Sequence, residues 1–523
     1  MLGFGGENAR EKVIVLFTMC FALAMAMLDN TVVNVALPSI ESELESGLSG
    51  LQWIVDGYVL AFASLLLTGG ILGDKYGRKR LFLIGLAVFT LSSLFCGLSE
   101  TTEQLIVARA LQGVGAALLM PGTLSIITVT FPPRERAKAI GLWAGVSGLA
   151  LALGPTLGGY LVEHVGWQSV FFINVPIGII AFAVAAWVVR ESRSDQARYL
   201  DVPGLVLGTG TLFLATYGLI EANQRGWTDP LILASLLGAA VLLGAFLMWE
   251  RRATHPMMPL DYFRIPAFSA GNTVAFCVSL GMFASFFFLS LYMQGIHGYS
   301  PFQAGVRFLP MTLAIVVTAP LAGRYASRHG SRAPMTYGLL LVGGGLLLLG
   351  LTIQADTPYV WMFPIFAIMG HGIGATMAPM TAAVMNAVGP QRAGLGSAMT
   401  NTSREVGGVL GIALLGTVLT TRLQAAFVPA LSSLGLSSAQ TAAIGDAAGH
   451  GQVDPALLQG LTPEQQAGVA QAFSTAFMDG FHVALAIGGI VLLVGAIVAN
   501  RFIPGRETIE QHNAEAEAMA LAH

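Results

Sequence analysis

Apolar stretches of about 20 residues recur along the whole sequence, and they restrict the possible folds more than any other feature. A helix of that length spans the hydrocarbon core of a bilayer. The stretches are continuous and lack the alternation of membrane β-strands, which excludes a β-barrel. Only 11% of the residues are charged, against about 25% in soluble domains. We delimit fourteen stretches, at 13–37, 50–72, 81–99, 104–124, 137–162, 167–189, 202–221, 229–250, 268–293, 304–326, 333–353, 359–380, 398–421 and 480–500. The predicted fold class is an all-α polytopic membrane protein with 14 transmembrane helices.

Basic residues divide the connecting segments into two alternating sets. One set, which includes both chain termini, carries 21 of the 26 Lys and Arg residues, whereas the other set is acidic or neutral. Because Lys and Arg are enriched on the cytoplasmic side, we predict a multi-pass protein of the inner or plasma membrane with both termini in the cytoplasm. The first stretch is longer than the apolar core of a signal peptide, about 7–15 residues, so we expect it to remain as the first span.

A motif after the second span recurs in degraded form after the tenth. The run 70–78 corresponds to the run 323–332, and aligning Gly77 with Gly330 gives an offset of 330 − 77 = 253 residues. A six-span half needs about 200 residues at the spacing seen here. The excess of about 50 residues matches the seventh and eighth spans, so two spans are inserted between the halves.

The repeat therefore predicts the domain organisation. An external segment, 425–478, contains Thr462, Pro463 and Gln465 in the order typical of a helix start, with Thr462 as the N-cap. Transporters built of repeats bind substrate near the midplane, where the halves meet. The predicted parts are an N-terminal half at 1–200, a two-helix insert at 201–252, a C-terminal half at 253–505 and a cytoplasmic tail at 506–523.

Acidic side chains inside the spans are rare, and each one is a candidate functional residue. Inserting a carboxylate into the membrane as part of a helix costs a free energy on the order of 3 kcal/mol. Asp29 lies in the first span, Asp56 in the second and Glu405 in the thirteenth. Asp56 is predicted at a depth similar to that of Asp29, and two acids in one vestibule would favour proton uptake near neutral pH; alternatively, Asp56 is a rim carboxylate in contact with water. We expect Glu405 to face the cavity, and a salt bridge at the inner interface is the alternative.

Other polar and aromatic residues complete the candidate set in the spans. Asn34 belongs to a polar strip beside Asp29 in the first span. In the fourth span Arg109 either snorkels to the interface or faces the cavity, and Gln112 shares its helix face because it follows three residues later. Phe286 belongs to an aromatic run that usually indicates helix packing; facing a cavity, it would suit lipophilic or cationic compounds.

Two glycine-rich motifs lie in the N-terminal half, one in the loop after the second span and one in the fifth span. The loop 69–80 contains Gly73, Asp74, Gly77 and Arg78. Its glycines permit a tight turn, and its aspartate could pair with basic groups or with a helix N-terminus across the interface between the halves. In the fifth span, small residues at a spacing of four allow two backbones to approach, and a proline kinks the helix. The residues of this second motif are Gly154, Pro155, Gly158 and Gly159.

The motifs of the first, fourth and fifth spans and of the loop 69–80 resemble those of the major facilitator superfamily, specifically its fourteen-span drug:proton antiporter branch. The resemblance covers nearly the whole chain. It implies two pseudo-symmetric six-helix halves, a loop 69–80 that acts as a conformational latch, and a fifth span that seals the cavity. From the residues and the resemblance together we predict proton coupling through Asp29, Asp56, Glu405 and Arg109, and substrate contact through Asp29, Asn34, Gln112, Glu405 and Phe286.

The predicted function is proton-coupled export of amphipathic or cationic small molecules by alternating access. The expected partners are a lipophilic substrate, protons and the lipid bilayer; we expect no nucleic acid, and a monomer should suffice. The sequence contains no nucleotide loop, metal-ligand cluster or nucleophile constellation, so we predict no enzymatic activity, no catalytic residues, no metal and no cofactor beyond the coupling H⁺. The alternatives are export of an endogenous lipid or metabolite, proton symport of a nutrient, and a non-transporting scaffold or sensor. The fifth-span motif argues against symport, and buried acids argue against a scaffold.

Overall fold

A computed structural model describes residues 9–505, apart from 132, 194–200, 389–392, 438–439, 442, 446–457 and 459–460. The described part is built of helices, and the β-structure found in it is one isolated bridge between Gly330 and Gly505. The predicted tail at 506–523 lies outside the described residues.

The N-terminal part of the chain forms a first bundle of helices. The sixth predicted span is divided between two helices, α6 and α7. The bounds are α1 Ala9–Leu44, α2 Gly47–Tyr76, α3 Arg78–Gly97, α4 Thr102–Thr130, α5 Pro133–His164, α6 Ser169–Phe172 and α7 Asn174–Val188.

The remaining helices form a pair, α8 and α9, and a second bundle. A π-helical turn, η2, continues α10, and a short helix, α11, precedes α12. The bounds are α8 Val202–Arg225, α9 Pro230–Arg252, η1 Leu260–Arg264, α10 Pro266–Leu291, η2 Tyr292–Ile296, α11 Pro301–Arg307, α12 Leu309–His329, α13 Arg332–Thr352, α14 Tyr359–Val388, α15 Ala393–Ser432 and α17 Pro463–Phe502.

Thirteen helical segments in the described residues are long and apolar enough to cross a membrane. In addition, α5 is 32 residues long and occupies the position of the fifth predicted span. Each predicted apolar stretch therefore corresponds to a helical segment, and the all-α membrane fold is confirmed.

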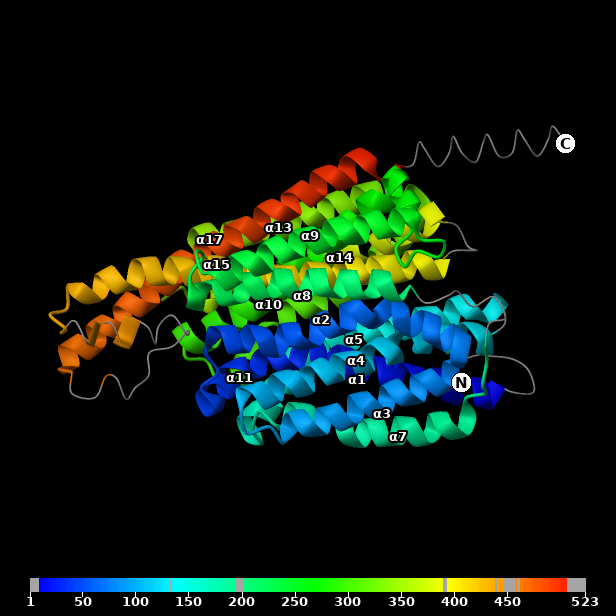
Figure 1. Cartoon of the computed structure of the whole chain (residues 1–523), viewed down its shortest axis with the longest axis horizontal. Coiled ribbons are helices and arrows are strands. Elements are labelled where there is room, and N and C mark those ends of the chain that lie inside the picture. Colours follow the sequence, from blue (N-terminus) through cyan, green and yellow to red (C-terminus); the bar gives the residue numbers. More distant parts are fainter. Residues whose placement is uncertain are drawn as a thin grey trace.

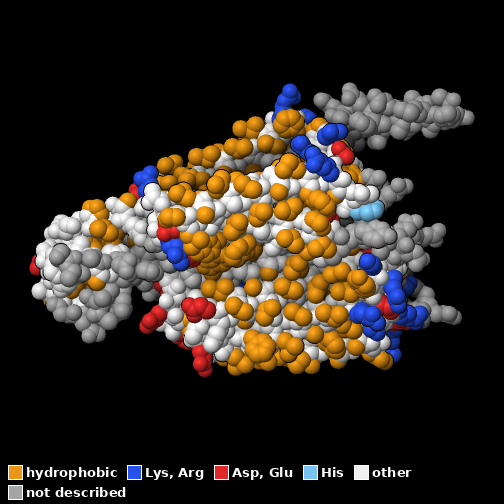
Figure 2. All heavy atoms as spheres, in the orientation of Figure 1, with side chains coloured by type: hydrophobic (Ala, Val, Ile, Leu, Met, Phe, Trp, Pro, Cys, Tyr) orange, Lys and Arg blue, Asp and Glu red, His pale blue; other side chains and the backbone are white. Residues whose placement is uncertain are grey.

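The helices run side by side along the molecule, with α1, α3, α4, α5 and α7 in the lower part of Figure 1 and α13, α14, α15 and α17 in the upper part. The helix α8 packs on α9 and also contacts α2 and α15, so the inserted pair lies against the seam between the bundles. Because α1 begins and α17 ends at the same end of the molecule (Figure 1), we call it the terminal end and the opposite one the loop end. Basic side chains gather mainly at the terminal end (Figure 2).

Close backbone contacts in the first bundle explain part of the high glycine content. A methyl group at Gly113 of α4 would overlap the carbonyl oxygen of Tyr58 in α2, and one at Gly69 of α2 would overlap the carbonyl oxygen of Ala117 in α4. Such small residues let helices approach closely in a bilayer, where packing rather than the hydrophobic effect drives association. The approach of α2 to α4 brings Tyr58 beside the polar core described below.

The external segment 425–478 is more helical than predicted. The helix α15 continues to Ser432, and α17 begins at Pro463, where the Thr462 side chain accepts a hydrogen bond from the Gln465 backbone as predicted for the N-cap. Both helices project beyond the bundles at the loop end (Figure 1). There the rings of Phe427 and Phe473 pack edge to face with their centroids 5.8 Å apart.

Candidate functional site

A buried ion pair between α1 and α4 forms the centre of the first bundle. Arg109 Nη1 lies 2.6 Å from Asp29 Oδ2, and both side chains are at most 1% exposed. The guanidinium also donates from Nε to the carbonyl oxygen of Ile54 at 3.2 Å, and its carbon lies 4.2 Å from the centre of the Tyr58 ring. Arg109 therefore does not snorkel to the interface; it faces the bundle interior and compensates the charge of Asp29.

Two amides extend this ion pair into a network. Gln112 Nε2 donates to Asp29 Oδ1 at 2.8 Å and to Ser93 Oγ at 3.2 Å, while its Oε1 accepts from Arg109 at 2.7 Å. Asn174 Nδ2 donates to Asp29 Oδ1 and to Ser93 Oγ, both at 2.9 Å. Gln112, predicted to contact substrate, is 0% exposed and holds Asp29 in this conformation.

Sequence reasoning missed Asn174 and Ser93. Asn174 lies in the run from Trp167 to Pro176, which from the sequence is interpreted as the structural start of the sixth span. The signal that could have marked Asn174 is its amide in an otherwise apolar segment. Ser93 carries no such signal, because serine is common in membrane helices and bonds readily to its own backbone.

Asn34 is separate from the network. Its Nδ2 donates to the Asn30 carbonyl oxygen one turn earlier at 3.1 Å, and its Oδ1 has no hydrogen-bond partner in the described residues. The Asn34 carbonyl oxygen accepts a hydrogen bond from Ser290 of α10 at 2.7 Å. Asn34 therefore lies at the seam between the bundles, where a substrate contact was predicted.

Asp56 is fully buried, and neither of its carboxylate oxygens has a hydrogen-bond partner in the described residues. It follows Trp53 by three residues and Gln52 by four, so it shares their face of α2. Gln52 Nε2 donates to the Ile412 carbonyl oxygen of α15 at 3.2 Å. Asp56 is thus not a rim carboxylate in this conformation, and its helix face points to α15 rather than to Arg109.

Glu405 of α15 is 6% exposed, and its Oε2 has no hydrogen-bond partner among the described residues. The same holds for Nε of the adjacent Arg404. The described salt bridges include none with Glu405, so the structure gives no support to the predicted alternative of an inner-interface salt bridge.

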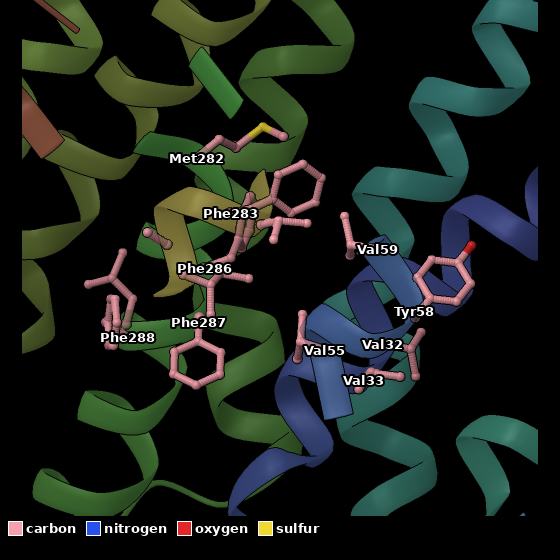
Figure 3. Close-up of a cluster of buried hydrophobic side chains, with 14 of the residues drawn as sticks. Val32, Val33, Val55, Tyr58, Val59, Met282, Phe283, Phe286, Phe287 and Phe288 are labelled. Carbon is pink, nitrogen blue, oxygen red and sulfur yellow. The ribbon is translucent and has the colours of Figure 1, made fainter. Parts of the chain in front are cut away.

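An apolar surface lies at the seam between the bundles. In Figure 3 the side chains of Phe283 and Phe286 from α10 lie across the seam from Val55 and Val59 of α2. Phe286 is 5% exposed, and its ring centroid is 5.2 Å from that of Phe308. The aromatic residue predicted to contact substrate thus packs within its own bundle and also faces the other one.

The predicted latch loop is held by contacts inside the motif and by contacts with residues that follow α7. Arg78 binds Asp74 one turn away through Nε at 2.9 Å and Nη2 at 2.8 Å. Gly77 has φ 121°, which favours glycine, and a methyl group there would come within 2.7 Å of the Glu191 carboxyl carbon. Gly73 is helical with free space around it, so the tight turn depends on Gly77 alone. The described bonds of Asp74 stay inside the motif and do not cross between the bundles.

The fifth-span glycines lie at two close helix contacts. Methyl groups at Gly154 and Gly158 would overlap Thr31 and Val32 of α1, so the predicted close approach is confirmed on this face. On the other side, a methyl group at Gly159 would overlap the backbone of α11 in the second bundle, and the carbonyl oxygen of Pro155 approaches Gly305 of α11 in the same way. The motif therefore lies at the interface between the bundles.

Hydrogen bonds between α5 and the second bundle continue this contact at the loop end. Glu163 accepts from the Phe302 backbone at 3.1 Å and from the Ser300 hydroxyl. Thr156 Oγ1 donates to the Gly305 carbonyl oxygen at 3.3 Å. The pKa of the exposed Glu163 carboxyl is lowered below its usual value, mainly by the hydrogen bond from the Ser300 hydroxyl and also by the one from the Phe302 backbone. These contacts hold the loop end closed in this conformation.

Comparison with known proteins places the chain in a family. The sequence profile of the Major Facilitator Superfamily matches residues 19–412. The Tetracenomycin C resistance and export protein of Streptomyces glaucescens is 37% identical over 92% of this chain and 90% of that protein. The Methylenomycin A resistance protein of Streptomyces coelicolor is 39% identical over 79% of this chain and 87% of that protein. The Multidrug resistance protein Stp of Mycobacterium tuberculosis is 32% identical over 95% of this chain and 93% of that protein.

A solved structure shares the fold. A bacterial homologue of the human lysosomal transporter Spinster, in an inward-facing and unoccupied conformation, aligns with a TM-score of 0.61 at 17% identity and covers 96% of this chain and 99% of that one. Together with the four sequence motifs, the profile match and the relatives show that the chain belongs to the major facilitator superfamily, a family of membrane transporters.

Proposed function

We propose that this transporter is a proton-coupled antiporter that exports amphipathic or cationic small molecules by alternating access. The observation that carries the proposal is the coexistence of two kinds of buried acid. Asp29 is fully bonded, whereas Asp56 and Glu405 have oxygens without a hydrogen-bond partner in the described residues. A buried carboxylate without a partner is unfavourable as an anion, so these two acids are suited to bind and release protons.

The proposed orientation follows from charge. Basic side chains gather at the terminal end (Figure 2), which we therefore place on the cytoplasmic side of the inner or plasma membrane. The closed loop end then lies on the outer side of the membrane. When the loop end opens, protons from outside reach Asp56 and Glu405 as substrate leaves; when it closes, they pass to the cytoplasm as substrate binds.

The ion pair gives Asp29 a role in the same cycle. A proton that reaches Asp29 neutralises the carboxylate and frees Arg109, whose guanidinium keeps its contacts with Gln112 and the Tyr58 ring. Moving one charge across the membrane is worth about 2.3 kcal/mol per 100 mV, so one or two protons per cycle can support a large concentration gradient. The chain needs no cofactor for this cycle and acts as a monomer.

The proposed substrate class rests on the seam and on the relatives. The surface around Phe283 and Phe286 (Figure 3) offers contact to flat lipophilic compounds, and the buried acids attract cations. The relatives are named for export of tetracenomycin C, resistance to methylenomycin A and multidrug resistance. We therefore propose lipophilic antibiotics and antiseptics as the first compounds to examine.

Transport in everted membrane vesicles tests this function. Vesicles with the wild-type chain, with Asp29→Asn or without the protein are energised and given a panel of cationic and neutral lipophilic compounds. We expect wild-type vesicles to accumulate some of the compounds, an uncoupler to prevent it, and addition of a transported compound to alkalinise the lumen.

Each alternative gives a different result. A nutrient symporter acidifies the lumen when its substrate is added, and this result would overturn the antiport assignment. Transport of a native lipid or metabolite extract, without transport of any panel compound, would move the substrate class to endogenous molecules. Equal accumulation by wild-type vesicles and by vesicles lacking the protein, for every compound and extract, would refute transport of these classes.

A further inference from the structure

A proline in α1 leaves one backbone carbonyl group without its helical partner. Pro38 lies inside α1, and proline has no N–H to donate to the carbonyl oxygen four residues earlier. That oxygen belongs to Asn34. It accepts a hydrogen bond from Ser290 Oγ of α10 at 2.7 Å instead. A carbonyl group freed in the first bundle is therefore bonded by a side chain of the second.

A second side chain strengthens this contact. Gln294, in the π-helical turn η2, donates from Nε2 to the Val35 carbonyl oxygen at 3.0 Å and to Ser290 Oγ at 3.1 Å. The turn is fixed to its own bundle, because the Tyr292 hydroxyl donates to the Gln354 carbonyl oxygen at 2.7 Å. Single π-helical turns occur frequently at functional sites. Here the turn directs Gln294 at α1.

We propose that Ser290 and Gln294 are gating residues that lock the loop end closed by bonding the carbonyl oxygens of Asn34 and Val35. The proposal rests on the alternating access argued above, because the lock has a purpose only if α1 and α10 separate at the loop end. Pro38 is the positioning residue: it keeps the Asn34 carbonyl group available. The motif of α5 seals the same end at a different pair of helices.

The chemistry of the lock suits a reversible gate. All of its donors and acceptors are neutral, so water can replace each bond when the loop end opens. A neutral hydrogen bond exchanged with water changes an equilibrium by about fivefold. The lock therefore favours the closed state without preventing opening.

Distances between spin labels at the loop end measure the lock directly. Ser42, near the end of α1, and Val360, near the start of α14, are both exposed and belong to different bundles. The labels are attached to S42C and V360C, and double electron–electron resonance of the purified full-length protein gives the ratio of open to closed molecules. We expect S290A to raise this ratio about fivefold and S290A/Q294L to raise it further.

Pro38→Ala tests the origin of the lock. The alanine supplies an N–H that returns the Asn34 carbonyl group to the helix, so P38A should also favour the open state. Because both changes remove the same bond, P38A/S290A should open the loop end no more than the stronger single variant. Full additivity of the two effects would overturn the role of the freed carbonyl group, and an unchanged ratio in S290A would overturn the lock itself.

Two controls separate the lock from general damage to the helix. Ser285 lies on α10, and among the described residues its hydroxyl bonds the Gly281 carbonyl oxygen of the same helix alone. S285A should therefore leave the ratio unchanged, and an S285A shift equal to that of S290A would overturn the assignment. If S290A does not fold, S290T retains the hydroxyl and S290V removes it at equal size, and only S290V should open the loop end. The measurement needs neither substrate nor a proton gradient, so it stands or falls independently of the exported compound.

Discussion

The two bundles bury their acids in opposite ways. In the first bundle, Asp29 receives hydrogen bonds from Arg109, Gln112 and Asn174. In the second, Glu405 is almost as deeply buried, but its Oε2 and the Nε of the adjacent Arg404 have no partner in the described residues. The first arrangement stabilises an anion, whereas the second leaves an acid free to change its protonation state.

This difference separates structural from coupling roles. A buried ion pair resists the loss of either partner, because the remaining charge is left uncompensated. Replacing a buried acid that has no partner by its neutral amide should change folding stability little, since the amide resembles the protonated form of the acid. Folding stability and proton coupling should therefore respond differently to substitutions in the two bundles.

Removal of the charge of Asp29 should have the largest effect. Asp29→Asn leaves Arg109 buried without an anion, which should lower the free energy of unfolding by about 3–5 kcal/mol and abolish proton-coupled export. Membrane insertion should remain intact, because the span becomes less polar. Alkaline extraction of membranes, thermal unfolding in detergent and transport in everted vesicles measure the three properties.

A double variant separates the charge from the fold. Arg109→Gln should destabilise the protein about as much as Asp29→Asn, whereas the combination removes both charges and should recover much of the stability without recovering export. Normal proton-driven export by Asp29→Asn would refute the role of Asp29. A double variant that loses the sum of both single effects would show that the ion pair is not the source of the instability.

Sequence reasoning finds both residues of the ion pair because charged groups in the spans are few. Each of them stands out in an apolar segment, so Arg109 and Asp29 can be recognised without a structure. Asn174 and Ser93 differ, because neutral polar residues are tolerated at many span positions and only the packing of α3 against α7 decides what they contact. The spans themselves can be predicted because their length and flanking charges are local properties of the sequence.

The loop 69–80 shows where prediction from a motif ends. Its residues suggest a contact between the halves, yet Asp74 binds Arg78 within the motif. The N-terminus of α3 is instead capped by Glu191, whose carboxylate accepts from the Lys79 and Arg80 backbone at 3.1 and 3.2 Å. Glu191 is more than 100 residues away in the sequence, and no local pattern connects it to the loop.

Glu405→Gln tests the second arrangement. Because Oε2 has no partner to lose, the free energy of unfolding should change by less than about 1 kcal/mol. Loss of one coupled proton should lower the attainable substrate gradient about fiftyfold at 100 mV. Exposed Glu464 in α17 provides the control, and Glu464→Gln should change neither property. If Glu405→Gln keeps the full gradient, Asp56 becomes the acid that couples export in the proposed cycle.

Asn174→Leu should have the smallest effect. It tests whether stability and export fall in proportion to the number of hydrogen bonds that Asp29 receives. Asp29 keeps Arg109 and Gln112 but loses one neutral donor, which should lower the free energy of unfolding by about 1–2 kcal/mol and reduce export several-fold. Thermal unfolding in detergent and transport in everted vesicles measure the two effects.

Asn272 of α10 supplies a control for this variant, because it is a buried asparagine far along the chain from Asp29. It donates to the Phe268 carbonyl oxygen of its own helix at 2.9 Å and accepts a hydrogen bond from Ser403 of α15 at 3.2 Å. Asn272→Leu should lower stability by a similar amount while leaving export nearly unchanged. If both variants reduce export equally, the loss reflects general loosening of the helices, and the donors of Asp29 have no separate role. A loss of export confined to Asn174→Leu would instead show that export depends on the hydrogen bonds that hold the Asp29 carboxylate.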